Sequence, residues 1–286
     1  MIYSENGKAR RVVPNGKRIG LALGGGVVRG LAHVGVLEAL EETGIPIDFV
    51  SGTSAGAIMA ACIAAGIDAR RIKEIAWMFT WPRLMRPVWP KRGLVSFDRM
   101  RRFLNQNLGE LRIEDLSLPL VIATTDIERG EPVYLREGPL ALAVQASCSV
   151  PGFVTPVEWQ GRWLAEGAMS DMVPVSILRE MGADYVIGVD IFSHKVRHWL
   201  GPLGYLLGGF EILLERSGLG LVQADCCITP ALSGKTYMRF SKRDELFELG
   251  RRAALIQLPV ITRNLGMDDE ALVGQEAATA DLTHSI

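Results

Sequence analysis

The sequence predicts an α/β protein in which a mostly parallel central sheet is flanked by helices in three layers. Short apolar, β-branched runs alternate with longer runs of good helix formers, a pattern typical of parallel sheets. The first two strand-to-helix connections are a glycine loop and a Gly-x-Ser-x-Gly turn, which places a sharp serine turn early in the chain. No Pro/Gly/Ser linker divides the 286 residues, so we expect one domain over residues 18–265. Residues 1–17 are then an N-terminal extension, and residues 266–286 a polar tail.

The first strand-and-helix unit contains the glycine loop. Residues 18–23 (RIGLAL) form a short apolar strand candidate, and a helix is expected over residues 31–42, because apolar residues recur there at helical spacing. The loop between them, GGGVVRG, is not a P-loop, since Gly30 is followed by Leu31 rather than by Lys and Ser/Thr. Nor is it a dinucleotide fingerprint, because Arg29 stands at the third glycine's place. The remaining functional interpretation is an oxyanion hole, with N–H groups at Gly25 and Gly26 and positive potential from Arg29.

The second unit is the stretch around which the chain is organised. Residues 47–51 are expected to form a buried strand and residues 55–65 a helix, so Ser54 lies on the corner of a nucleophile elbow. Such a turn crowds its neighbours, and Gly52 and Gly56 remove the Cβ atoms that would clash. The serine hydroxyl is then exposed above a helix N-terminus, where developing negative charge is stabilised. A plain Gly/Ser turn is the alternative interpretation of the same residues.

Further along the chain, the expected elements are strands at 118–125 and 131–135 that continue the parallel sheet, a helix at 140–148, strands at 161–165, 184–190 and 224–230, and a helix at 244–258. Two further segments have neither the helical nor the strand periodicity of apolar residues. Residues 76–97 mix tryptophan, proline and basic residues, and are expected to form a loop or cap at a membrane surface or acyl-chain entrance, with a packed surface loop as the alternative. The apolar run at 199–214, broken by Pro202 and glycines, is a second candidate for peripheral membrane contact.

Glu166 follows the strand expected at 161–165 and is the candidate base. A Ser–His–acid triad is the rival hypothesis, since the order Ser54, Glu166, then His194 or His198 matches α/β-hydrolases. That fold places several strands before its elbow, whereas here a single strand and helix precede Ser54. We therefore expect surface histidines at both positions and a structural role for His33.

Composition excludes several classes of protein. A net charge of −1 indicates no nucleic-acid partner, and 48% hydrophobic residues allow a sizeable core. The four cysteines form no CxxC pair and no HExxH occurs, so we expect a reduced cytoplasmic protein with neither a metal site nor a cofactor. There is no signal-peptide pattern and no run of the ~18 apolar residues that a membrane span requires. Any membrane contact is therefore expected to be peripheral, on the inner face.

Taken together, these motifs resemble the patatin-like phospholipase family, in particular its bacterial branch of small serine esterases. The resemblance rests on GGGVVRG followed by LAHVGVLEAL, on GTSAG, on ASCSVPGFVTPV, and on an acid-glycine motif with a downstream Pro174, and it covers roughly residues 18–255. It implies a patatin-like three-layer fold and a Ser–Asp dyad that hydrolyses acyl esters of lipids. Ser54 then corresponds to the nucleophile, and the glycine loop to the oxyanion hole.

One position departs from the family pattern. The family has Asp where this chain has Glu166, and the additional methylene displaces the carboxylate, so we expect a working but handicapped base. Asp171 lies five residues further on, where the family usually has asparagine, and is expected to act from behind the dyad. The alternative to an acyl-ester hydrolase is a catalytically impaired patatin-like protein that serves as a lipid-binding or scaffold protein.

Overall fold

The computed structural model describes most of the chain: residues 13–14, 16–193, 198–218, 220–235 and 238–267, with the backbone of a short N-terminal pair, β1 (Ile2–Tyr3) and β2 (Ala9–Arg10). Most of the expected N-terminal extension and C-terminal tail lies outside the described residues, as does His194.

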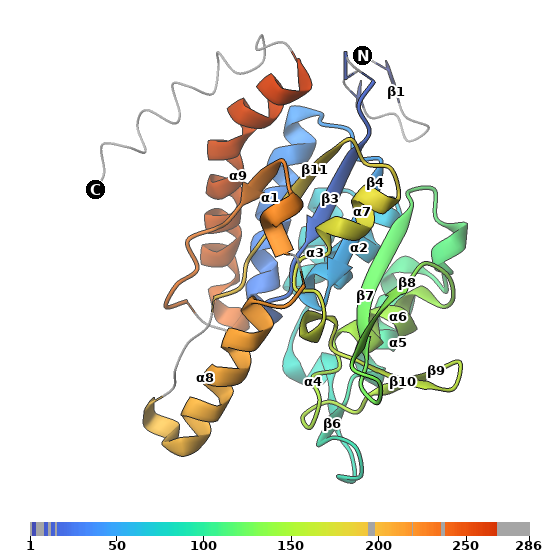
Figure 1. Cartoon of the computed structure of the whole chain (residues 1–286), viewed down its shortest axis with the longest axis vertical. Helices are drawn as coiled ribbons and strands as arrows, with labels where there is room; N and C mark the ends of the chain where they lie inside the picture. The colour runs from blue at the N-terminus through green and yellow to red at the C-terminus, as the bar shows by residue number, and fades with distance from the viewer. Residues whose placement is uncertain are drawn as a thin grey trace.

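An eight-stranded sheet forms the centre of the molecule (Figure 1). Its strands are β3 (Ile19–Leu23), β4 (Phe49–Thr53), β7 (Leu120–Asp126), β8 (Glu131–Leu135), β9 (Val157–Trp159), β10 (Arg162–Ala165), β11 (Tyr185–Val189) and β12 (Cys226–Ile228). The order is β12-β11-β3-β4-β7-β10-β9, and β8 pairs with β7. The strands from β12 to β7 are mutually parallel, which confirms the predicted mostly parallel sheet.

Strand β8 corrects one expectation, because it runs antiparallel to β7 instead of extending the parallel sheet. Only residues 127–130 separate the two strands, whereas a parallel neighbour requires a crossover connection of a dozen or more residues. Strands β9 and β10 are also antiparallel, to each other and, for β10, to β7. The sheet therefore changes from parallel to antiparallel pairing at β7, which has a parallel neighbour in β4 and antiparallel neighbours in β8 and β10.

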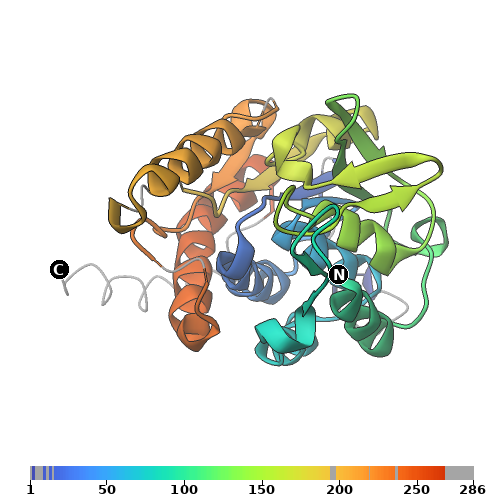
Figure 2. The same cartoon turned by 90° about the horizontal axis from the view of Figure 1, so that it is seen from below.

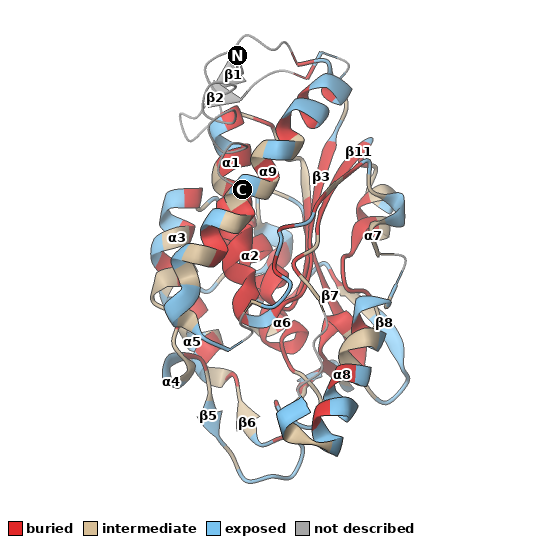
Figure 3. Ribbon diagram, turned by 90° about the vertical axis from the view of Figure 1, so that its left-hand side faces the viewer, coloured by how far each residue is buried: buried red, intermediate tan, exposed pale blue. Residues whose placement is uncertain are grey.

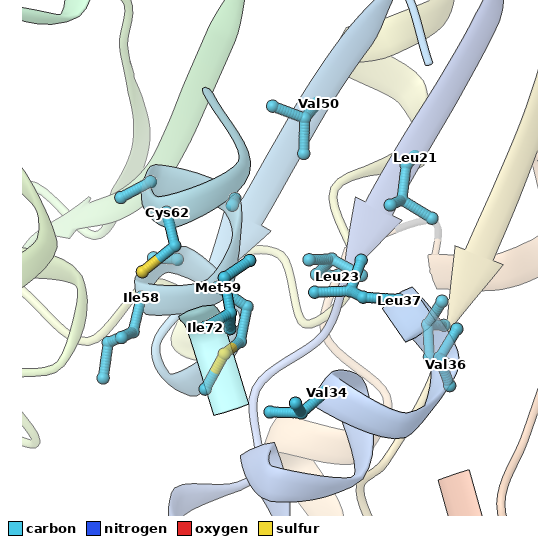
Figure 4. Close-up of a cluster of buried hydrophobic side chains, with 14 of the residues drawn as sticks. Leu21, Leu23, Val34, Val36, Leu37, Val50, Ile58, Met59, Cys62 and Ile72 are labelled. Atoms are coloured by element: carbon cyan, nitrogen blue, oxygen red, sulfur yellow. The ribbon is translucent and has the colours of Figure 1, made fainter. Parts of the chain in front are cut away.

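Helices cover both faces of the sheet (Figures 2 and 3). One face carries η1 (Val27–Gly30), α1 (Leu31–Thr43), α2 (Ala55–Ala64), α6 (Leu140–Ser147) and α9 (Arg243–Leu265), and the other carries α7 (Val175–Glu180) and α8 (Pro202–Glu215). Leu21, Leu23 and Val50 point from β3 and β4 toward α1 and α2 (Figure 4). Ala22, between the two leucines, packs in the cluster on the opposite face, as the alternation of a strand requires.

The segment expected to be a loop or cap is more ordered than its sequence indicates. Residues 76–97 include the end of α3 (Ala69–Trp77), the whole of α4 (Trp81–Leu84) and a hairpin of β5 (Arg86–Pro87) and β6 (Val95–Ser96). Helix α5 (Asp98–Leu108) follows directly. Helices α3 and α5 were not among the predicted elements, although their buried apolar residues have helical spacing.

The expected break at 199–214 is wrong in part, because α8 is continuous from Pro202 to Glu215. Pro202 lies in the first turn, where its missing N–H costs no intrahelical hydrogen bond. Among the helices of the described residues, none combines the length and apolarity needed to cross a bilayer.

Helices α1 and α9 pack at very close range because two glycines lie at the contact. A Cβ on Gly35 would be 2.1 Å from the carbonyl oxygen of Phe247, and one on Gly250 would be 1.9 Å from that of Ala32. The two backbones therefore touch directly, with no room for a side chain at either position.

We expect Gly250→Ala to destabilise the protein by about 1–3 kcal/mol, because the methyl group forces α9 away from α1. Gly209→Ala is a matched control in exposed α8, where the added methyl meets nothing within 4 Å. It should instead stabilise by roughly 0.5–1 kcal/mol, as alanine has the higher helix propensity. Urea unfolding of the two variants measures both effects, and an equal gain in both would contradict the close packing.

Candidate active site

The candidate nucleophile and base are brought together by the way two strands share one edge of β7. Strand β4 ends at Thr53, paired with Ala123 of β7, and β10 ends at Ala165, paired with Thr125. Because β8 occupies the other edge of β7 over residues 122–126, β4 and β10 lie on the same edge and run toward each other. The residues that follow the two strand ends, Ser54 and Glu166, therefore face each other beside residue 124.

Ser54 occupies the strained corner between β4 and α2. Its backbone has φ 53° and ψ −119°, a left-handed conformation that non-glycine residues rarely adopt. A Cβ on Gly52 would lie 2.6 Å from the carbonyl oxygen of Gly56, and one on Gly56 would lie 2.0 Å from that of Leu23. Both glycines are thus required where the elbow folds onto β3.

Ser147, at the end of α6, holds the elbow in place. Its hydroxyl accepts a hydrogen bond from the Ser54 N–H at 2.8 Å and donates one to the carbonyl oxygen of Ala123 at 2.7 Å. It therefore ties the turn to the strand on which β4 and β10 meet, and this bridge stabilises the left-handed conformation of Ser54.

Glu166 reaches the nucleophile directly. Ser54 Oγ donates to Glu166 Oε2 at 3.1 Å, while Glu166 Oε1 accepts from the N–H of Ala168 at 3.3 Å. The backbone is also fixed: the Glu166 N–H donates to the Ser149 carbonyl at 2.9 Å, and the Thr125 hydroxyl donates to the Glu166 carbonyl at 2.9 Å. The longer side chain is accommodated because Glu166 caps a short 3₁₀ turn, η3 (Gly167–Met169), in which the Ala168 N–H donates to the second carboxylate oxygen.

Burial controls the charge of this carboxyl group. Glu166 is only 3% exposed, and burial raises its pKa from 4.5 to about 8, although the hydrogen bonds from Ala168 and Ser54 act in the opposite direction. Burial also raises the pKa of the neighbouring Cys148 thiol, and the Glu166 carboxylate adds to that rise. Within the described part of the chain, no cluster of three side chains could hold a metal ion here.

The glycine loop lies over the nucleophile. Gly24 is fixed from two sides, because its N–H donates to the Val189 carbonyl at 2.9 Å and its carbonyl lies 2.8 Å from Nε2 of buried His33. A Cβ on Gly25 would be 3.5 Å from the Ser54 Cβ, so the loop lies against the serine. The Gly25 N–H donates to the Met172 carbonyl at 3.3 Å, so it is not the free oxyanion donor that was expected. The N–H groups of Gly26 and Val27 have no acceptor among the described residues. Val27 is held at φ 53°, and these two amides are available to a ligand.

Arg29 does not serve the loop as expected. Its backbone N–H donates to the Gly26 carbonyl at 3.0 Å, which removes it as an oxyanion donor. Its fully buried guanidinium donates to the carbonyl oxygens of Ser193 at 2.9 Å and Lys235 at 3.0 Å. The guanidinium, which was expected to supply positive potential to the loop, is instead bound by carbonyl oxygens of two other segments, and the side chain thereby ties three segments together.

Asp171 lies behind the dyad. Its Oδ2 accepts a hydrogen bond from the Tyr134 hydroxyl at 2.8 Å, and its carbonyl accepts one from the Thr53 hydroxyl at 2.9 Å. Burial raises the pKa of this carboxyl group to about 6. These contacts join β8, the end of β4 and the loop that carries Glu166, so Asp171 supports the backbone on both sides of the site.

The histidine of the rival triad, His198, is exposed, and its Nδ1 lies 3.1 Å from the Tyr205 hydroxyl.

An apolar cavity of about 170 Å³ opens beside the serine. Val27, Leu31, Ile58, Met100 and Phe240 are among the residues that line it, together with Ser54 and Cys148. A hydroxyl nucleophile at the wall of such a cavity fits a substrate with a hydrocarbon chain.

Three contributors to this site were not identified from the sequence. Ser147 and Ser149 belong to the ASCSV run, and Thr125 ends a predicted strand, but nothing in their spacing indicated a role. Their contacts with the elbow and with Glu166 depend on how α6 and β7 are placed in three dimensions. Cys148 also lines the cavity together with Ser54, a position that no sequence pattern indicated.

Comparison with known proteins assigns the class. The family model described as "Patatin-like phospholipase" matches residues 21–179, more than half of the chain. The chain belongs to the patatin-like phospholipase family.

Individual relatives agree with this assignment. The human "Patatin-like phospholipase domain-containing protein 6" is 34% identical over 222 residues, which are 75% of this chain and 16% of that protein. "Lysophospholipase nte1" of Aspergillus fumigatus is 35% identical over 65% of this chain and 12% of its own length. An uncharacterized NTE family protein of Mycobacterium bovis is 35% identical over 61% of this chain and 49% of its own length. The chain thus spans half or less of these relatives.

Among solved structures, VipD from Legionella pneumophila has the same fold. It superposes with a TM-score of 0.59 over 91% of this chain and 69% of that chain, at 15% sequence identity. The shared architecture therefore persists where most of the sequence differs.

The pKa of Glu166 makes a prediction about stability. Its value in the folded state, about 8, lies above its ordinary 4.5, so the folded state retains a proton that the unfolded chain has lost. This stabilisation is complete below pH 4.5 and is lost as the pH rises to about 8, at up to about 1.4 kcal/mol per pH unit. Glu166→Gln should remove that slope and make the protein more stable than wild type at the alkaline end.

Urea unfolding at both ends of this pH window measures the effect, with Glu158→Gln on exposed β9 as the control. Parallel stability curves for the wild type and Glu166→Gln would show that the carboxyl group is ionised throughout.

Proposed function

We propose that this chain is a serine acyl-ester hydrolase that acts on lipids, of the phospholipase A or lysophospholipase type. The observation that carries the proposal is the 3.1 Å hydrogen bond from Ser54 Oγ to Glu166 at the wall of an apolar cavity. The printed names of its relatives, which include a lysophospholipase, support the same class of substrate.

In the proposed mechanism, Ser54 Oγ attacks the ester carbonyl carbon while the ionised Glu166 takes the hydroxyl proton. The carbonyl oxygen becomes an oxyanion that accepts hydrogen bonds from the N–H groups of Gly26 and Val27, near the N-terminus of α2. Collapse of this intermediate breaks the bond to the alcohol, which receives the proton from Glu166. Water then attacks the acyl-serine, with Glu166 again taking and returning a proton.

A carboxylate can serve here without a histidine because its oxygen already lies within hydrogen-bonding distance of the nucleophile. The raised pKa has a second consequence, since only the ionised form can accept the serine proton. The proposal therefore includes a rate of acylation that increases with pH up to about 8.

Peripheral membrane contact through residues 77–97 and 199–214 is part of the proposal. Trp199, Leu206 and Leu213 are 82%, 69% and 70% exposed on and beside α8, and Trp89 is 79% exposed in the hairpin. Such side chains favour the interface between a lipid surface and water. Figure 1 places α8 and the hairpin at the end of the molecule away from the N-terminus.

Ser54→Ala should abolish hydrolysis of short acyl esters and labelling by a fluorophosphonate, while leaving the melting temperature close to that of the wild type. The hydroxyl is the proposed nucleophile, and its loss removes one hydrogen bond from the core. Ser233→Ala, at an exposed turn, is the control and should retain full activity. A wild-type protein that binds lipid but is neither labelled nor active would instead favour the non-catalytic lipid-binding alternative.

Glu166→Gln should nearly eliminate acylation, because the amide cannot accept the serine proton. A handicapped base, as expected from the sequence, would become faster in Glu166→Asp, but we propose the opposite. The glutamate already reaches Ser54, so shortening the side chain should withdraw the carboxylate by more than 1 Å and slow acylation by on the order of 100-fold. Pre-steady-state acylation of the three proteins is the measurement. A faster Asp variant would restore the view of Glu166 as a handicapped base, and a Gln variant as fast as wild type would reject its role.

A further inference from the structure

One surface segment differs sharply in charge from the rest of the chain. Residues 83–102 contain seven Lys and Arg residues and one acid, Asp98, whereas the whole chain has a net charge of −1. The segment comprises the end of α4, the β5–β6 hairpin and the first half of α5. The positive charge is therefore concentrated on one part of the surface, as expected for contact with an anionic partner.

Three of these arginines line a single pocket. Arg83 comes from α4, and Arg99 and Arg102 come from the first two turns of α5. The pocket has a volume of about 430 Å³, and its other polar lining residues are the amides Gln106 and Asn107. Of the residues that line it, none is a carboxylate, so three cations share a hollow without an anion.

The arginines are held in position by contacts that leave most of their donors available. One nitrogen of Arg83 donates to the Met78 carbonyl at 3.1 Å, and Nη1 of Arg99 donates to the Pro82 carbonyl at 2.8 Å. Asp98 lies 3.9 Å from Arg102 but 2.7 Å from Arg86, with which it makes its closer ion pair. A guanidinium has five N–H donors, and one or two such contacts orient it without exhausting them.

The same elements form the rim and wall of the apolar cavity. Trp81, Leu84 and Met100 of α4 and α5 line that cavity. The N–H groups of Leu94 and Val95 donate to the carbonyl of Phe153, which also lines the cavity. Figures 1 and 3 show α4 and the hairpin together at the end of the molecule opposite the N-terminus.

We propose that the pocket formed by Arg83, Arg99 and Arg102 binds the phosphate group of an anionic phospholipid headgroup. Guanidinium groups bind phosphate oxygens in a bidentate manner, and clusters of Lys and Arg at a membrane surface attract anionic lipid headgroups. The exposed Trp89 and Leu94, 79% and 54% accessible, then enter the interface beside the bound headgroup. Binding at this site places the cavity against the lipid surface, and it is independent of whether the serine is catalytic.

Flotation with phosphatidylcholine vesicles, with and without phosphatidylglycerol, tests the proposal in the Ser54→Ala background, so that hydrolysis plays no part. Arg99→Gln/Arg102→Gln should weaken binding to the anionic vesicles. The matched control, Lys91→Gln/Arg101→Gln, removes the same charge from the same segment outside the pocket. The pocket pair should lose at least about tenfold more affinity than the control, because only the pocket pair removes the donors that converge on one phosphate.

Two further arms keep the test decisive. Arg99→Lys/Arg102→Lys retains the charge and the side-chain stem, so it should fold normally yet bind several-fold more weakly than wild type. Equal binding by the Lys pair and the wild type, or equal losses in the two Gln pairs, would show that charge alone is sufficient and would overturn the site. Melting temperatures in inorganic phosphate and in chloride at matched ionic strength separate the sources of phosphate. A stabilisation by phosphate that needs these arginines, without any preference for anionic vesicles, would overturn the assignment to a lipid headgroup.

Discussion

The meeting of β4 and β10 on one edge of β7 is the constraint on which the candidate site depends. A parallel and an antiparallel neighbour approach from opposite directions, so the residue after each strand, Ser54 or Glu166, arrives at the same place. The two residues are 112 positions apart in sequence, yet their side chains are hydrogen-bonded. Since β7 pairs with both strands, the distance between them is set by sheet geometry, and Ser147 and Thr125 fix the remaining backbone.

The burial of Glu166 affects both its pKa and the stability of the folded protein. Burial excludes water from Glu166 and raises its pKa, which makes the protonated form the stable one near neutrality. A base of this kind accepts a proton readily once ionised, but ionisation is opposed by the environment that positions it. Burial therefore lowers the stability of the folded protein at alkaline pH, where Glu166 has to ionise, while it keeps the carboxylate in direct contact with Ser54.

Close backbone packing and exposed apolar side chains occur in different parts of the molecule. The glycine-mediated packing of α1 on α9 leaves no room for a side chain. The hairpin and α8, at the end away from the N-terminus, expose large apolar side chains and bury few of them in the core. The cavity is lined by residues of α2, α4 and α5, so it lies where the tightly packed scaffold meets the more exposed segments.

The sequence by itself determined the α/β class, the parallel core and the elbow, because strand and helix periodicity and the Gly-x-Ser-x-Gly spacing are local patterns. It also indicated Ser54 and Glu166, though not the distance between them. Only the tertiary structure decided that β8 and β10 run antiparallel and that the Arg29 N–H is occupied within its own loop. Only it showed that the Glu166 carboxylate, supported by Ala168, reaches the serine. These outcomes depend on contacts between segments far apart in the chain, and no local pattern of residues encodes where such segments meet.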